Sequence, residues 1–170
     1  MALPEARTPE IPAEPIPLDI LYEDSDLIAI NKQADLIVHP ARGNWTGTMV
    51  NALAYYFKKD WRDIGQLPTS GEIFRPGIVH RLDKGTSGVV VVAKSAEAHA
   101  GLAAAFAERR VTKQYRALVW GHPKPASASI ERSIGRSRSQ PLKMAVRGTR
   151  GRTRVAETRY ETKEILPGFA

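Results

Sequence analysis

Two short apolar segments near the amino end are separated by a polar turn. The segments cover residues 19–22 and 27–31, and the turn between them is Glu23-Asp24-Ser25-Asp26. Short apolar runs on both sides of such a turn are typical of a β-hairpin. A third apolar run, Val89 to Ala93, follows a turn of small residues and predicts a buried strand.

Two other segments carry apolar residues at helical spacing. The first begins near Thr46 or Thr48, either of which can cap a helix, and has one apolar face up to residue 57. The second runs from about Ser95, a suitable capping residue, to about Arg110, with an apolar stripe at intervals of four from Ala98. Both stripes predict helices that pack against a core.

The remaining pattern is dominated by strands. Residues 115–120, around 127–134, around 142–146 and 154–162 all read as strands. Few helices and many strands predict an α+β fold with a mixed, largely antiparallel sheet and a few packed helices. Residues 1–17 hold five prolines and predict an extended, acidic lead-in. Residues 18–170 then form one domain.

The sequence His-Arg-Leu-Asp-Lys-Gly-Thr-Ser-Gly at residues 80–88, here called the signature loop, immediately precedes the run Val89 to Ala93. It places one carboxylate, that of Asp83, among basic and hydroxyl groups on a loop beside a strand, where chemistry is often found. An ionised aspartate suits covalent catalysis at a sugar carbon or proton abstraction from it. The alternative is structural: Asp83 caps a turn, and Arg81 pairs with a local acid.

Composition excludes several classes of site. The chain has no cysteine, which rules out disulfides, thiolate nucleophiles and cysteine-zinc sites. Its four histidines lack metal-binding spacing, and glycine-rich phosphate-binding loops and a serine-hydrolase motif are absent, so we expect no metal and no nucleotide cofactor. Apolar stretches are too short to cross a bilayer. We therefore expect a cytoplasmic protein with no membrane partner.

The formal net charge of +7 is unevenly distributed. Residues 1–26 carry a net charge of −6, whereas residues 27–128 carry +7 and residues 129–170 carry +6. A basic surface that begins with the folded region points first to nucleic acid. The alternative is ordinary surface charge that maintains solubility.

The signature loop resembles that of the RluA-type pseudouridine synthases, which isomerise uridine in RNA. Further segments look like landmarks of the same family, in matching order between residues 18 and 166. They are Ile20–Asp24, Ile30–Lys32, Val38–Pro40, Asn51–Leu53, Arg75–Val79, Lys113–Val119 and Lys143-Met144. The resemblance implies a pseudouridine synthase fold and a cofactor-independent isomerase acting on RNA, with rRNA favoured over tRNA. We expect the chain to be a monomer.

The resemblance also implies roles for individual residues. Asp83 matches the catalytic aspartate, and Tyr115 is similar to an active-site tyrosine that packs near the target base. Arg81 matches an arginine that fills the space left when the target nucleotide turns out of the RNA, a step that costs a few kcal/mol. Further RNA-binding positions are expected at His80, Lys143, Arg136 and Arg138. For Tyr115 the alternative is a core tyrosine on a strand.

The sequence departs from the family pattern at two places. Lys32-Gln33-Ala34-Asp35 stands where the family has Lys-Pro-Ala-Gly, which relaxes that loop. The family's Gly-Arg-x-His-Gln-Ile-Arg motif, whose first arginine pairs with the catalytic aspartate, lies beyond residue 170; Gly151–Arg154 does not replace it. We therefore expect a catalytic domain that is incomplete at its carboxyl end, with open strand edges.

Two alternatives to an active synthase follow. One is a non-catalytic RNA-binding remnant, inactive because the arginine motif is absent. The other is a glycosidase-like enzyme that would use Asp83 with a second carboxylate, such as that of Glu72 or Glu108, across the site.

Overall fold

The computed structural model describes residues 11–41, 43–57, 76–137, 139–140, 143–146 and 153–166. The chain divides into two compact units, Met1–Lys113 and Gln114–Ala170. The predicted α+β class is confirmed, because two helices accompany strands that pair antiparallel in two three-stranded sheets. Neither helix within these ranges is long and apolar enough to cross a membrane.

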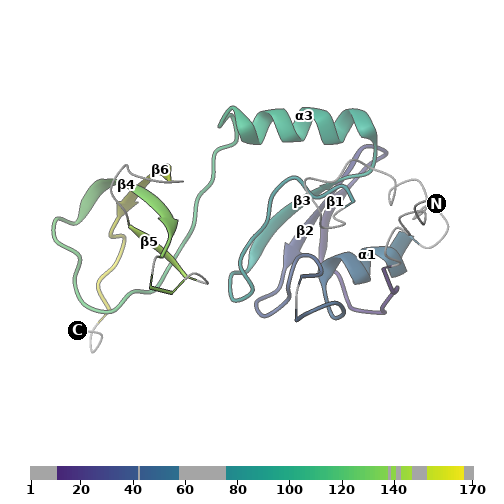
Figure 1. The fold of residues 1–170 in the computed structure, drawn as a ribbon, viewed down its shortest axis with the longest axis horizontal. Helices are drawn as coiled ribbons and strands as arrows, with labels where there is room; N and C mark the ends of the chain where they lie inside the picture. The colour runs from purple at the N-terminus through teal and green to yellow at the C-terminus, as the bar shows by residue number, and fades with distance from the viewer. Residues whose placement is uncertain are drawn as a thin grey trace, which may run out of the picture. The chain divides into compact units, whose positions relative to one another are not determined.

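The first unit is built on the sheet β1-β2-β3 (Figure 1). Strands β1 (Ile20–Glu23) and β2 (Leu27–Lys32) form the predicted hairpin, and β2 pairs along its whole length with β3 (Gly88–Ala93). Ile28 and Ile30 on β2 share one face with Val90 and Val92 on β3, and all four are at most 1 % exposed. This face is the centre of the hydrophobic core.

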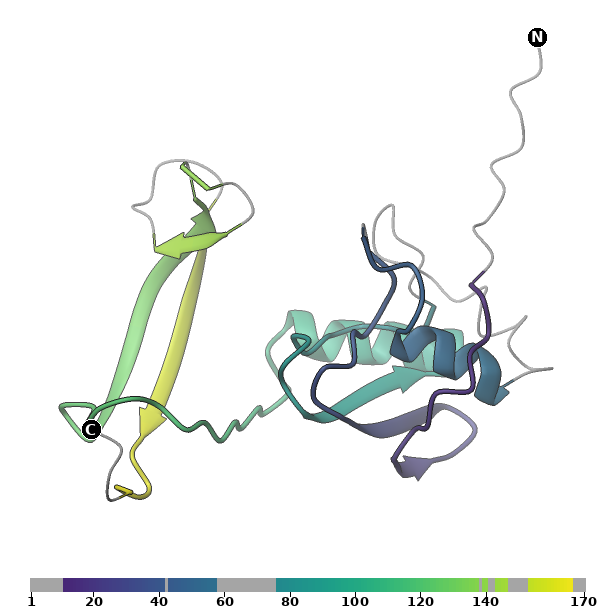
Figure 2. The ribbon, with the colours of Figure 1, turned by 90° about the horizontal axis from the view of Figure 1, so that it is seen from below.

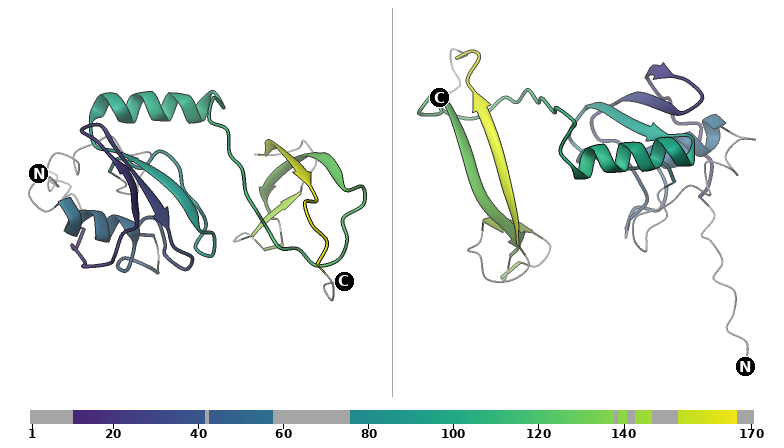
Figure 3. Two further views of the ribbon diagram at one scale, coloured as in Figure 1. Left: turned by 180° about the vertical axis from the view of Figure 1, so that it is seen from behind. Right: turned by 90° about the horizontal axis from the view of Figure 1, so that it is seen from above.

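Two helices flank this sheet (Figures 1 and 3). Helix α1 (Met49–Phe57) places its apolar residues in the core, and Thr48 and Asn51 cap it through reciprocal bonds between backbone and side chain. Helix α3 (Ala96–Ala107) lies beside β3, and its cap is Ser95, as predicted. Ala98 and Leu102 from α3 are partly buried against the core.

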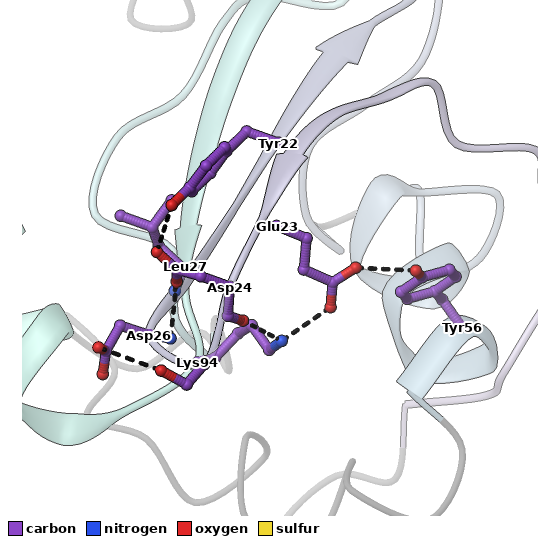
Figure 4. Close-up of polar contacts among 8 residues, drawn as sticks. Tyr22, Glu23, Asp24, Asp26, Leu27, Tyr56 and Lys94 are labelled. Atoms are coloured by element: carbon purple, nitrogen blue, oxygen red, sulfur yellow. Dashed lines mark hydrogen bonds and ion pairs between the residues drawn. The ribbon is translucent and has the colours of Figure 1, made fainter.

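A polar cluster joins four of these elements at the end of the sheet where β2 begins and β3 ends (Figure 4). The ammonium of Lys94 contacts the carboxylate of Glu23 at 2.7 Å, and Tyr56 on α1 donates to the same carboxylate at 2.8 Å. Burial acts to raise the pKa of Glu23, but the hydrogen bonds from Lys94 and Tyr56 outweigh it and hold this pKa below its usual value. Asp24 accepts from the backbone N–H groups of Asp26 and Leu27 and so closes the hairpin turn.

The expected lead-in has no regular secondary structure over its described part, residues 11–17, but it packs closely against α1. Glu14 donates its backbone N–H to the carbonyl of Asn51 at 3.0 Å, and the side chain of Asn51 donates to the carbonyl of Pro12 at 2.8 Å. Ile11 and Ile16 are partly buried against the core. The first unit therefore begins to pack before residue 18.

The second unit contains the sheet β5-β4-β6. Its strands are β4 (Ser127–Arg136), β5 (Met144–Val146) and β6 (Arg154–Glu161), close to the predicted ranges. Figure 2 shows β4 and β6 as a long two-stranded ribbon with β5 beside one end. Gly135 is the one buried residue among those described in this unit, so both faces of the sheet are accessible.

The prediction of a strand at residues 115–120 is wrong. These residues have no regular secondary structure, and all of them are exposed, including Leu118 at 68 % and Trp120 at 83 %. Residues with high β-propensity form a strand only when a partner strand completes the hydrogen-bond ladder. No ladder in the described part of the chain includes this segment.

Candidate active site

The segment that leads into the signature loop contacts β3 at a position that requires glycine. Gly77 accepts a hydrogen bond from the backbone N–H of Ala93 at 2.9 Å, and Ile78 forms an antiparallel bridge with Val92. Gly77 has φ +71°, and a Cβ built there would lie 2.3 Å from the carbonyl oxygen of Ala93. Only glycine permits this close approach, which holds the segment directly before the loop against β3.

The next contact with β3 comes from a side chain. Val91, two residues before Ala93, donates its backbone N–H to Nε2 of His80 at 3.0 Å. The imidazole thus takes the position on the open edge of β3 that a carbonyl of a fourth strand would occupy. Its ring also stacks on Phe106 of α3, with centroids 4.4 Å apart and planes 17° apart.

His80 is neutral in this arrangement. An Nε2 that accepts a hydrogen bond leaves the ring proton on Nδ1. Burial lowers the pKa of His80 below 6.5, and the positive charge of Lys113 lowers it further. His80, which the sequence assigned to RNA binding, therefore also connects the signature loop to β3 and α3. Its contact with RNA stays a prediction.

Beyond His80 the loop has one buried side chain, that of Leu82, between two exposed ones. Leu82 is 8 % exposed and anchors the loop in the core, whereas Arg81 and Asp83 on either side of it are exposed. The Nη2 atom of Arg81 lies 3.7 Å from Oδ1 of Asp83, with the two side chains 57 % and 86 % exposed. Thr86 donates its backbone N–H to the carbonyl of Asp83 at 3.1 Å and closes the turn. The carboxylate of Asp83 thus stands open to solvent beside a guanidinium.

Lys32 holds the signature loop through hydrogen bonds to backbone carbonyls, a role that the sequence did not predict. Its side chain is 1 % exposed, and its ammonium donates to the backbone carbonyls of Gln33 at 2.9 Å, Leu36 at 2.8 Å and Lys84 at 3.2 Å. Burial lowers the pKa of Lys32, and the carboxylates of Asp35 and Asp83 act in the opposite direction. Lys32 has the same parity on β2 as the buried Ile28 and Ile30, and this pattern could have revealed it.

The same carbonyl of Lys84 also accepts a hydrogen bond from the backbone N–H of Asp35 at 2.8 Å. Asp35 stands where the family pattern has glycine, and it adopts φ +67°. Aspartate tolerates this left-handed conformation better than most residues with a side chain. The loop after β2 therefore keeps a glycine-like turn without glycine.

The other residues assigned from the sequence belong to the second unit. Tyr115 is 64 % exposed, and its partnership with Asp83 stays a prediction. Arg136 is the last residue of β4 and is exposed, and Lys143 directly precedes β5 and is also exposed. Arg138 lies outside the described residues. The RNA contacts of these residues stay predictions.

Comparison with known proteins places the signature loop in a defined family. The model of the family described as "RNA pseudouridylate synthase" matches residues 26–164. The chain belongs to this family. The match covers β2 and β3 of the first sheet, the signature loop and all three strands of the second sheet. It confirms the resemblance that the sequence indicated.

Relatives and solved structures agree with this assignment. The chain is 44 % identical over 158 residues to "Ribosomal large subunit pseudouridine synthase D" of Zymomonas mobilis. This alignment covers 93 % of the chain and 47 % of the relative. It is 40 % identical over 182 aligned positions to "RNA pseudouridine synthase 2, chloroplastic" of Arabidopsis thaliana. This alignment covers 92 % of the chain and 42 % of the relative. The chain thus spans about half the length of these relatives.

A solved structure of the human "RNA Pseudouridylate Synthase Domain Containing 1" superposes with a TM-score of 0.61 at 28 % sequence identity. The alignment covers 87 % of the chain and 53 % of the human protein. The pseudouridine synthase fold predicted from the signature loop is therefore confirmed.

Proposed function

We propose that this chain carries the catalytic aspartate of an RNA pseudouridine synthase, and that Asp83 is that residue. The observation that supports this most directly is the mounting of the loop. The signature loop is held to the first unit by contacts of four residues, Gly77, His80, Leu82 and Lys32. The carboxylate of Asp83 remains exposed. A carboxylate held on a rigid support and open to a large substrate is suited to react with RNA.

The reaction rearranges bonds without changing the composition of the nucleoside. The bond between N1 of uracil and C1′ of ribose breaks, a bond between C5 and C1′ forms, C5 loses a proton and N1 gains one. No oxidant and no phosphoryl donor are required. Asp83 can contribute by attacking the sugar or by removing a proton from it, since an ionised carboxylate is competent for either.

Arg81 has a second role in this proposal. Its guanidinium is 57 % exposed and 3.7 Å from Asp83, so it reaches the same volume in which the target nucleotide would lie. An exposed ion pair of this kind contributes about 0–1 kcal/mol to stability. Arg81 can therefore leave Asp83 at little cost and occupy the gap in the RNA after the base turns out. Tyr115 is proposed as the aromatic neighbour of the target base.

The proposed substrate is rRNA. Support comes from the relative in Zymomonas mobilis, whose name specifies the large ribosomal subunit. We also propose that residues 18–170 act as one catalytic region, because the family match runs from residue 26 to residue 164 and includes parts of both units. A monomer acting in the cytoplasm completes the proposal, and light scattering and cell fractionation test these two points.

The decisive experiment quantifies pseudouridine by chromatography after the chain is incubated with unmodified rRNA and tRNA transcripts. The variants are Asp83→Asn and, as a matched control, Glu97→Gln, which neutralises an exposed carboxylate at the start of α3. We expect product with the native chain and with Glu97→Gln and none with Asp83→Asn. Absence of product from a chain that melts cooperatively would contradict autonomous activity and favour an RNA-binding protein.

A further inference from the structure

The register of the second sheet sorts its side chains onto two faces. Strands β4 and β6 pair without a bulge from Ser127 opposite Glu161 to Ile134 opposite Arg154. Residues directly opposite each other point to the same face, and successive residues alternate. Even-numbered residues of β4, β5 and β6 therefore share one face, and odd-numbered residues share the other.

The two faces differ in charge. Among the residues of β4, β5 and β6, the even-numbered face carries Arg132, Arg136 and Arg154 and no carboxylate, and we call it the arginine face. The odd-numbered face carries Glu131, Glu157, Glu161 and Arg159, and we call it the acidic face. On the acidic face Arg159 contacts Glu157 at 2.9 Å, so its charge is neutralised locally.

The three cations of the arginine face form a compact row. Arg154 lies opposite Ile134 and is therefore diagonal to both Arg132 and Arg136, and diagonal positions are about 7–8 Å apart. All three arginines are exposed, and exposed apolar side chains such as Met144 lie on the same face. Arg132 and Arg154 bring two positive charges close together on this face, which favours a polyanionic partner.

We propose that the arginine face binds the phosphate backbone of the substrate RNA. This inference rests on the proposed function, which supplies the reason why an RNA is the partner. A guanidinium presents planar, forked donors that bind phosphate oxygens in pairs, and the exposed apolar side chains between the arginines suit contact with ribose. The acidic face repels the same backbone, so the sheet has a defined orientation on the RNA.

The test compares two double variants, each of which removes two positive charges from the second unit. Arg132→Gln with Arg154→Gln alters the arginine face. Arg159→Gln with Lys163→Gln is the control, because both of these cations are paired with glutamates of β6. The dissociation constant for labelled, unmodified large-subunit rRNA transcripts is measured by fluorescence anisotropy at several salt concentrations.

We expect the arginine-face variant to bind at least tenfold more weakly at 0.15 M salt, and the control to change less than twofold. The slope of log affinity against log salt should decrease in magnitude by about 1.4–1.8 for two lost phosphate contacts, at about 0.7–0.9 each. A second variant, Arg132→Lys with Arg154→Lys, should retain most of this slope because it keeps the charge. Equal losses in both double variants, or none in either, would overturn the proposal.

Two further outcomes separate this inference from the proposed function. Asp83→Asn should bind RNA like the native chain, so absence of pseudouridine together with an arginine-dependent affinity would refute only the proposed catalysis. Pseudouridine formation with an affinity insensitive to Arg132 and Arg154 would refute only the arginine face. If instead the native chain self-associates in sedimentation and the arginine-face variant does not, the face binds protein and the RNA proposal is overturned.

Discussion

Replacement of His80 by phenylalanine should loosen β3 selectively at Val91. The substitution retains an aromatic ring that can stack on Phe106 and removes the nitrogen that accepts the hydrogen bond of Val91. A buried donor left without an acceptor costs about 1–3 kcal/mol. Val91 is only half-buried, so about 1–1.5 kcal/mol is the appropriate range, which corresponds to about five- to twelvefold faster amide exchange.

The comparison variant is His80→Gln, which offers an amide oxygen as acceptor but has no ring. It should keep most of the protection at Val91 while losing about 0.5–1.5 kcal/mol of stacking with Phe106. Hydrogen exchange followed by NMR measures both effects on single amides. If the Val91 amide exchanges at the native rate in His80→Phe at pH 7.5, the ladder role of His80 is refuted.

The same hydrogen bond should make the native chain sensitive to acid. The folded structure favours neutral His80, so its pKa is lower than in the unfolded chain. The stabilisation is therefore complete above the unfolded value of about 6.5 and is lost as the pH falls below it toward the folded pKa. Protection at Val91, corrected for the intrinsic pH dependence of exchange, should fall in this window in the native chain and stay constant in His80→Gln. A native profile parallel to that of His80→Gln would contradict this reasoning.

Two further predictions concern the supports of the signature loop. Lys32→Met should destabilise the first unit by about 1–3 kcal/mol in urea denaturation because it removes three hydrogen bonds to buried or partly buried backbone carbonyls. Lys84→Met, which removes an exposed side chain, should change stability by less than about 0.5 kcal/mol. Equal effects would contradict the role of Lys32. Gly77→Ala should cost at least about 2 kcal/mol from strain and the clash with Ala93, whereas Gly85→Ala, with nothing within 4 Å of its Cβ, should be tolerated. Urea denaturation and exchange at the amide of Ala93 measure this difference, and a tolerated Gly77→Ala would show that β3 can shift.

Local sequence signals predicted most of the first unit. Ser95 and Thr48 cap their helices as expected, and the apolar periodicity of α1 and of the hairpin fixed which faces meet in the core. Such features depend on contacts within a few residues, which a sequence displays directly. Residues 115–120 were mispredicted because a strand depends on a partner that is distant in sequence.

For the site, the sequence singled out Asp83 and Arg81 by the order of residues around them, and their roles stay predictions. It did not identify Lys32, because the lysine acts through three backbone carbonyls, one of which is 52 residues away. The inward contacts of His80 were also missed, since they depend on β3 and α3. Every residue type has a backbone carbonyl, and every residue except proline has a backbone N–H. The sequence therefore does not show which remote backbone group a side chain contacts.

The attachments of the signature loop separate scaffold from chemistry. Lys32 and Asp35 bind the carbonyl of Lys84, and Thr86 binds the carbonyl of Asp83, so the exposed side chains at 83 and 84 provide none of these attachments. The side chain at position 83 can therefore be replaced while these backbone contacts hold the loop in shape. A photoreactive residue placed there would, on irradiation, crosslink the protein to the RNA that it binds, and the crosslinked nucleotide would identify the position of the target uridine.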